Sequence, residues 1–198
     1  MTKLVSEKYC LLLDAAKEII AVKGLEKTTI SDIVKKAGVA QGTFYLYFSS
    51  KNAVVPAIAE EYLENLFARI KEQAKGTPAF FDLLRVLIGE TFKATKQSQD
   101  VLELCYSGFA ITRAFEQWEI IYQPYYAWLE QQLNKAKEAG EVRLLLNTGQ
   151  TVRMIINLIE GAAERLYLFQ EKDISVQAMK DELFIFIKNA IYGDDIYP

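Results

Sequence analysis

Apolar residues recur every three or four positions along most of the chain, the spacing that gives a helix one buried face. No alternating strand pattern of any length occurs, so we predict an all-α fold. Pro124 either kinks one helix or starts a second. The predicted helices cover 9–23, 30–37, 41–48, 51–75, 112–139 and 148–170, with others beginning at Thr77-Pro78, near Ser98 or Asp100, and after Ser175.

Two short helices joined by a glycine-containing turn stand near the N-terminus. Thr29 is placed to cap the first of them, Asp32 completes a capping box, and Gly38 follows its last apolar residue. The second helix, 41–48, begins after a three-residue turn, and Phe44 and Phe48 would share one of its faces. This is the helix-turn-helix arrangement, whose second helix enters the DNA major groove. A glycine-punctuated helix pair also occurs in helical proteins that bind no DNA.

The side chains around the second helix suit DNA recognition. Gln41 can pair with adenine or reach other base edges, and Thr43 can donate, accept or contact a thymine methyl group. Tyr45, Tyr47 and Lys51 have the reach and the donors for phosphate oxygens. The predicted DNA-binding residues are Thr29, Ser31, Gln41, Gly42, Thr43, Tyr45, Leu46, Tyr47 and Lys51.

The stretch VAQGTFYLYFSSKNAVV resembles the recognition-helix region of the TetR family of bacterial transcriptional regulators, whose members read like G-V-S-x-G-T-x-Y-x-Y-F-x-S-K. The resemblance covers residues from about 8 to about 58, and beyond them it is architectural only. Ala40 stands where the family usually has a capping Ser, which should weaken the start of the second helix. Gln41 stands where Lys is common, which shifts one contact from charge towards base-edge recognition.

The resemblance implies a helix-turn-helix DNA-binding domain over 1–50, followed by a larger helical ligand-binding and dimerisation domain over 51–198. TetR-like proteins pair through their last two helices, here about 148–192, and read a palindromic operator on double-stranded DNA as homodimers. The final helix carries apolar residues on too much of its surface for one buried face, which is typical of a partner surface. We therefore expect a ligand-responsive repressor that a small lipophilic or aromatic effector releases, with no cofactor.

Aromatic residues are concentrated between Phe115 and Trp128. Such a stripe at helical spacing is typical of core packing, and the alternative is a ligand pocket lined by rings. No convergent set of charges identifies the ligand. The predicted pocket residues are Phe92, Tyr106, Phe109, Trp118, Tyr122, Tyr126 and Tyr167.

The charge of the chain is unevenly distributed. The net charge is −3, yet residues 1–51 carry 8 lysines against 5 acidic residues, while the remainder carries 15 basic against 21 acidic residues. A basic N-terminal segment on an acidic body fits a protein that meets phosphate at one end only.

The absence of histidine restricts the chemistry further. It excludes Ser-His and Cys-His catalytic sites and His-ligated zinc, and Cys10 and Cys105 show no metal-ligand spacing. We therefore expect no metal site and no enzyme; the enzyme that remains conceivable would use carboxylates such as Glu116, Glu119 or Glu160 beside an aromatic substrate. The other alternative is a helical protein–protein adaptor without sequence-specific DNA binding.

The sequence shows no sign of membrane insertion or export. No apolar run approaches the roughly 18 residues that a bilayer span needs, and the N-terminus lacks the apolar centre of a signal peptide. We expect a cytoplasmic protein with no membrane partner.

Overall fold

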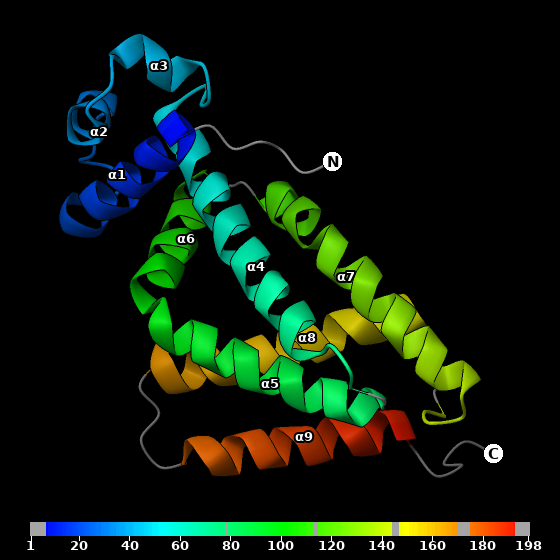
Figure 1. Ribbon diagram of the computed structural model, residues 1–198. Helices are drawn as coiled ribbons and strands as arrows, with labels where there is room; N and C mark the ends of the chain where they lie inside the picture. Colours follow the sequence, from blue (N-terminus) through cyan, green and yellow to red (C-terminus); the bar gives the residue numbers. More distant parts are fainter. Residues whose placement is uncertain (1–6, 78, 113–114, 144–146, 170–174, 193–198) are drawn as a thin grey trace. The chain divides into compact units, whose positions relative to one another are not determined.

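The structure, a computed structural model, describes residues 7–77, 79–112, 115–143, 147–169 and 175–192, with the backbone alone for 109–112 and 115–116 (Figure 1). Every regular element in these ranges is helical, as predicted. No helix in them is long and apolar enough to cross a membrane. The elements are α1 (Glu7–Lys23), α2 (Ile30–Ala37), α3 (Gln41–Tyr45), the 3₁₀ helix η1 (Lys51–Ala53), α4 (Val54–Gln73), α5 (Phe80–Gln97), α6 (Gln99–Thr112), α7 (Phe115–Glu138), α8 (Thr148–Tyr167) and α9 (Val176–Tyr192).

The helices belong to two compact units. The first combines Met1–Leu63 with Asp100–Ile121, and therefore contains α1 to α3, the first half of α4, α6 and the start of α7. The second combines Glu64–Gln99 with Tyr122–Pro198, and contains the rest of α4, α5, most of α7, α8 and α9. The boundaries between the units thus fall inside α4, at the first residue of α6 and inside α7.

The core of the first unit joins the helix-turn-helix to α6. Phe44 and Phe48 do share one face, with ring centroids 5.3 Å apart, and both are buried. Leu104 and Cys105 of α6 belong to the same apolar cluster as the buried residues of α1 and α2. Burying one such large side chain contributes about 1.5–3 kcal/mol, so α6 is a structural part of this unit.

A glycine allows α6 to approach α4 closely within the first unit. A Cβ atom built on Gly108 would lie 2.7 Å from Cγ1 of Val55, closer than real Cβ atoms come to a neighbour. Val55 is fully buried. Only a residue without a side chain therefore fits this contact.

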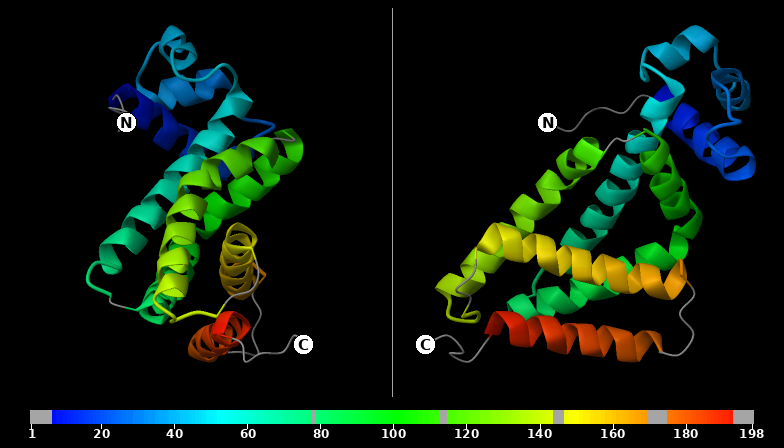
Figure 2. Two further views of the ribbon diagram at one scale, coloured as in Figure 1. Left: turned by 90° about the vertical axis from the view of Figure 1, so that its right-hand side faces the viewer. Right: turned by 180° about the vertical axis from the view of Figure 1, so that it is seen from behind.

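The second unit is built around α5, α8 and α9, which pack pairwise on one another (Figure 2). Each helix turns an apolar face to the other two because its large aliphatic and aromatic residues recur at helical spacing. The buried residues include Leu84, Leu87 and Phe92 on α5, Ile155, Ile156 and Ile159 on α8, and Leu183, Phe184 and Ile187 on α9.

Several helix ends differ from the prediction by a few residues. The helix predicted over 51–75 is α4, which runs from Val54 to Gln73 after η1, and the helix predicted over 112–139 is α7, which begins at Phe115 and ends at Glu138. The second helix of the helix-turn-helix, α3, ends at Tyr45 rather than Phe48. The reason is that Leu46 and Tyr47 donate to the carbonyl oxygens three residues back, the 3₁₀ pattern that tightens a last turn. The helix predicted over 148–170 ends at Tyr167. Pro124 lies inside α7, which continues through it as one helix.

The start predicted at Thr77-Pro78 is wrong for Thr77, and Pro78 lies outside the described residues. The Thr77 hydroxyl donates to the carbonyl oxygen of Ala74 at 2.8 Å, so it serves the end of the preceding turn. Helix α5 begins at Phe80, and Oε2 of Glu141 accepts the Phe80 N–H at 2.8 Å. A carboxylate distant in sequence therefore replaces the local cap.

Candidate functional sites

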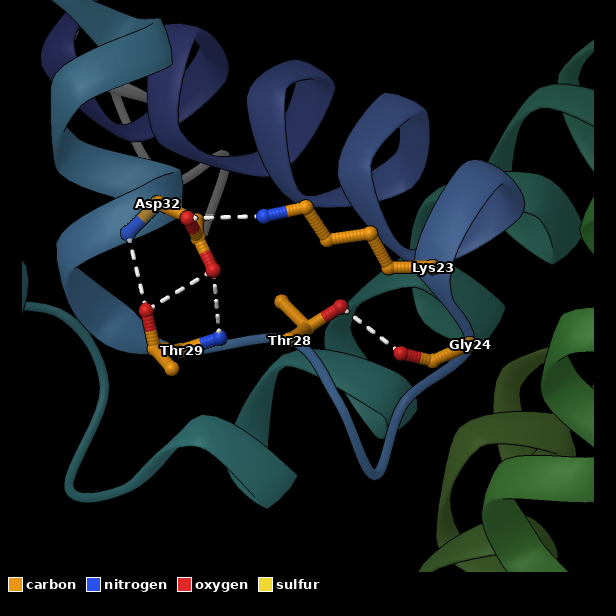
Figure 3. A network of polar contacts seen from close by, with 5 residues as sticks. All are labelled: Lys23, Gly24, Thr28, Thr29 and Asp32. Carbon is orange, nitrogen blue, oxygen red and sulfur yellow. Dashed lines mark hydrogen bonds and ion pairs between the residues drawn. The ribbon is translucent and has the colours of Figure 1, made fainter.

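The first helix of the helix-turn-helix begins in a closed network of polar contacts (Figure 3). The Thr29 hydroxyl accepts the Asp32 N–H at 3.1 Å, and Oδ2 of Asp32 accepts the Thr29 N–H at 3.1 Å and its hydroxyl at 2.8 Å. Lys23, at the end of α1, pairs with Oδ1 of Asp32 at 2.9 Å. The hydrogen bonds from Lys23 and Thr29 lower the pKa of Asp32 to about 2. The predicted capping box is confirmed, and the Lys23–Asp32 pair ties α2 to α1.

Thr29 therefore has a role inside the first unit. Its hydroxyl hydrogen and its backbone N–H both bond to the Asp32 carboxylate, so neither can reach a phosphate without breaking the box. Ser31, in the first turn of α2, is exposed. Direct DNA contact by either residue stays a prediction.

The turn between α2 and α3 has the geometry that glycine permits. Gly38 has a left-handed backbone with φ of 67°, and the Val39 N–H donates to the Val34 carbonyl oxygen at 3.1 Å. This is a Schellman-type helix end. Ala40 then occupies the N-cap position of α3 and provides no side-chain hydrogen bond, as its sequence position predicts. The start of α3 is thus held mainly by the turn before it and by the buried Phe44.

The outer surface of α3 and of the turn after it consists of predicted DNA-binding residues. Gln41 and Gly42 are exposed, and Thr43 is half-buried. Tyr45 is 54% exposed and Leu46 is 78% exposed, unusual for large apolar side chains. Such a projecting surface, carried by a helix that Phe44 anchors, suits insertion into a groove.

Tyr47 and Lys51 lie deeper than the α3 surface. Tyr47 is half-buried, with its ring centroid 5.8 Å from that of Tyr9. Nζ of Lys51 donates to the carbonyl oxygens of Leu25 and Glu26 at 2.6 and 3.0 Å. A lysine ammonium group has three donors, so one remains for a phosphate oxygen. Lys51 thus fastens the loop after α1, and its phosphate contact stays a prediction.

Several other lysines of the first unit are engaged with carboxylates. Lys36 pairs with Glu18 at 2.6 Å. Lys17 contacts Asp14 and Glu61, each at 2.7 Å. Burial alone would lower the pKa of Lys17, but the hydrogen bonds and the charge attraction of these two carboxylates together outweigh it and raise the pKa.

Lys27 and Lys35 differ from these lysines, because both are exposed and neither forms an ion pair with a residue that the structure describes. We did not identify them from the sequence, because residue pattern does not separate a paired surface lysine from an unpaired one. The structure separates the two kinds of lysine, because it shows Lys23 and Lys36 paired with carboxylates and their neighbours Lys27 and Lys35 without such a pair among the described residues.

The predicted ligand-pocket residues occur in pairs. In the first unit, the rings of Tyr106 and Trp118 have centroids 6.4 Å apart. The side chain of Phe109 lies outside the described residues. In the second unit, the ring centroids of Tyr122 and Tyr126 are 5.5 Å apart, and those of Phe92 and Tyr167 are 6.4 Å apart. Whether all of them line one pocket stays a prediction.

A partly buried carboxyl group lies next to one of these pairs. Oε1 of Glu160, on α8, accepts a hydrogen bond from the Tyr122 hydroxyl at 2.9 Å. Burial raises the pKa of Glu160 to about 8; the Tyr122 hydrogen bond opposes this rise and the nearby Glu164 adds to it. The group is therefore mostly protonated near neutral pH and can donate a hydrogen bond. The described residues contain no cluster of acidic or sulfur ligands that could hold a metal ion.

Comparison with known proteins matches both parts of the chain. Residues 12–58 match the model of the bacterial regulatory proteins of the tetR family, and residues 84–191 match that of the tetracyclin repressor-like C-terminal domain. The chain is 52% identical over 191 residues to YvdT of Bacillus subtilis, an uncharacterized HTH-type transcriptional regulator, covering 96% of this chain and 98% of that one. The chain belongs to the TetR family.

One further curated relative and one solved structure are similar over nearly the whole chain. The fatty acid metabolism regulator protein of Bacillus subtilis is 28% identical over 191 residues, covering 94% of this chain and 96% of that one. The crystal structure of the regulator FadR from Bacillus subtilis in complex with stearoyl-CoA superimposes with a TM-score of 0.77 at 22% identity, covering 92% of this chain and 99% of that one. At this identity the likeness of structure shows the fold alone.

TetR-family membership decides between the functional classes left open by the sequence. The protein is a ligand-responsive, DNA-binding transcriptional regulator of the repressor type, and it is not an enzyme. Nothing in its fold or its relatives supports the adaptor alternative.

Proposed function

We propose that this TetR-family protein represses transcription as a homodimer on a palindromic operator and that a small lipophilic effector releases it. In this proposal residues 1–50 form the DNA-binding domain and residues 51–198 the ligand-binding and dimerisation domain. The observation that carries the proposal is the projecting surface of α3, held by the Gly38 turn and the buried Phe44. A single helix-turn-helix buries little surface on DNA, so two related by a two-fold axis are needed for tight binding.

The DNA-binding part of the chain, called the head below, makes two classes of contact with DNA. Gln41 and Thr43 read base edges, because they are accessible on α3 and carry donors and acceptors. Tyr45, Tyr47 and Lys51 contact phosphates, and this fixes the register of α3 without reading sequence. The exposed Lys27 and Lys35 add phosphate contacts, because no described carboxylate neutralises them.

Helices α8 and α9 supply the dimer interface. Met154 and Leu158 lie four residues apart on α8, and Ile185 and Phe186 lie on α9. All four side chains are between 42% and 62% exposed, although the same helices also bury a full apolar face within the second unit. Exposed apolar side chains gathered on two adjacent helices favour a partner surface, and two copies of this pair would form a four-helix bundle.

Replacing one of these side chains tests the interface. We expect Phe186→Glu to convert the protein from dimer to monomer in sedimentation equilibrium at micromolar concentration, because a charge would be buried without a partner. Gln131→Glu, at an exposed position of α7, introduces the same charge and should leave the dimer intact. A Phe186→Glu protein that remains dimeric would exclude this interface.

The effector site belongs to the second unit. The aromatic pairs Tyr122–Tyr126 and Phe92–Tyr167 offer ring surfaces, and the protonated carboxyl of Glu160 offers one hydrogen-bond donor. This combination suits a lipophilic molecule with a polar acceptor group. The stearoyl-CoA bound by FadR makes long-chain acyl-CoA the first effector to test. The effector must bind the released conformer more tightly than the DNA-bound one, or it shifts nothing.

Fluorescence anisotropy with a labelled operator tests the effector. We expect stearoyl-CoA at micromolar concentration to release the operator, with free CoA and stearate as controls for the head group and the chain. An operator complex that survives saturating stearoyl-CoA would exclude acyl-CoA as the effector.

A further inference from the structure

A cavity of ≈580 Å³ lies within the second unit. Its walls come from the end of α4 and the turn after it, the start of α5, and the second half of α7 with the turn that follows. None of the predicted pocket residues lines it. The volume falls within the range of about 300–1,000 Å³ typical of small-molecule sites.

One part of the cavity wall is apolar. Phe80 and Leu83 of α5 are buried in the wall, and Trp128 of α7 adds an indole face. Phe67 of α4 holds this indole in place from the side, with ring centroids 5.4 Å apart in a T-shaped contact. Four alanines line the same cavity and leave room beside the rings: Ala136 of α7, and Ala74, Ala79 and Ala139, which lie directly beside the ends of α4, α5 and α7. The wall therefore accommodates a compact apolar or aromatic group.

The rest of the lining is basic. Lys71, Lys75 and Lys135 line the cavity. Lys75 is paired with Glu72, whereas Lys71 and Lys135 form no ion pair with a described residue. Nζ of Lys71 instead lies 4.0 Å from the ring centroid of Phe67, next to the aromatic wall. Two lysines without an ion-pair partner among the described residues are unexpected in this part of the chain, because acidic side chains outnumber basic ones there: residues 52–198 carry 15 basic against 21 acidic side chains.

The lining contains one carboxylate, and it is already engaged. Oε2 of Glu141 accepts the Phe80 N–H at the start of α5. The positive end of the α5 dipole stabilises this carboxylate in place. Lys71 and Lys135 therefore meet no competing lining carboxylate, and the cavity presents a net positive field beside an apolar wall.

We propose that this cavity is a second ligand site, which binds a small amphipathic anion. The apolar or aromatic body of the ligand packs on Trp128 and Phe80, and its single carboxylate pairs with Lys71 and Lys135. A neutral molecule of the same shape loses the ion pairs, and a small inorganic anion loses the ring contacts. The site stands independently of the effector site proposed above, because the two share no residue.

Isothermal titration calorimetry of the full-length protein with 1-naphthoate tests this site, with 1-naphthalenemethanol as the neutral analogue and inorganic phosphate as the small anion. We expect naphthoate to bind one site per chain, at least tenfold more tightly than either comparison compound. In the variant Lys71→Gln/Lys135→Gln this affinity should fall at least tenfold.

The matched control is Lys96→Gln/Lys137→Gln, which removes the same charge from exposed positions of α5 and α7 outside the cavity. It should bind naphthoate as the unmodified protein does. Naphthoate that fails to bind would overturn the proposal, as would an equal loss in both double variants. Phosphate that binds as tightly as naphthoate would reduce the cavity to an adventitious ion site only. Circular dichroism checks that each variant is folded.

Discussion

Nζ of Lys51 lies 2.6 Å from the main-chain carbonyl oxygen of Leu25 and donates a hydrogen bond to it. The bond connects the start of η1 with the loop after α1, two segments 26 residues apart in sequence. A lysine that sequence alone suggests for phosphate binding therefore also holds the DNA-binding head together.

Replacing Lys51 separates these two roles. Lys51→Met removes a charged donor from two carbonyl oxygens, so we expect the free energy of unfolding to fall by about 1–3 kcal/mol. Where Lys51 also contacts a phosphate, the slope of log affinity against log salt concentration should become shallower by about 1. Urea unfolding and operator titrations at several salt concentrations measure both. Unchanged stability would contradict the structural role.

Ala40 leaves the N-terminus of α3 without a side-chain cap. Ala40→Ser supplies a hydroxyl that can accept a free N–H of the first turn, and we expect it to stabilise the head by roughly 0.5–2 kcal/mol. Operator affinity should rise in the same variant because α3 is better formed before binding. Ala40→Val, which gives no hydroxyl and is as poor an N-cap as Ala, serves as the comparison. A Ser variant with the stability of the Val variant would contradict this role of the cap.

Gly108 and Val55 form a contact that can be tested as a pair. Gly108→Ala gains about 1 kcal/mol of helix propensity but places a Cβ against Val55, at a typical overpacking cost of about 1–3 kcal/mol. We expect Gly108→Ala to be destabilising and the double variant with Val55→Ala to be more stable than the sum of the two single effects. A double-mutant cycle from urea unfolding measures this. If the changes in the free energy of unfolding are additive, there is no steric conflict between the side chains at the two positions.

Glu160 makes the stability of the protein depend on pH. Its pKa is about 8 in the folded protein against an ordinary value of 4.5, so between these values the unfolded chain gives up a proton that the folded chain keeps. The free energy of unfolding should therefore decrease as the pH rises through this window, by up to about 5 kcal/mol in total. Glu160→Gln keeps an acceptor for Tyr122 and should flatten this part of the profile. Parallel urea unfolding profiles of the two proteins between pH 5 and 8 would contradict a buried, protonated Glu160.

Local features of the head could be predicted from the sequence. The Thr29–Asp32 capping box and the Gly38 helix end depend on residues within a few positions of one another, so the residue pattern specifies them. The early end of α3 could not be predicted, because Leu46 and Tyr47 are compatible with continued helix.

Contacts between distant residues escaped prediction. The cap of α5 comes from Glu141, 61 residues after Phe80, and no local motif signals it. The carbonyl partners of Lys51 lie in a loop whose position depends on the packing of α1. The lysine-lined cavity combines short stretches of α4, α5 and α7 with the turns beside them, and no local motif signals that these stretches come together.

Recovery of bound genomic DNA tests sequence-specific operator binding most directly. Sheared DNA from the source organism would be incubated with the purified protein, and the retained fragments sequenced, in parallel with a Gln41→Ala/Tyr45→Ala variant whose changes lie on the exposed surface of α3. We predict enrichment of one or a few loci that share an imperfect palindrome, with half-sites about one helical turn apart, roughly 34 Å, and loss of this enrichment in the variant. The protein is also unfolded, dialysed and refolded to remove any bound effector, and the experiment is repeated. If the refolded protein enriches no locus above the level of the variant, this result contradicts a sequence-specific operator-binding dimer.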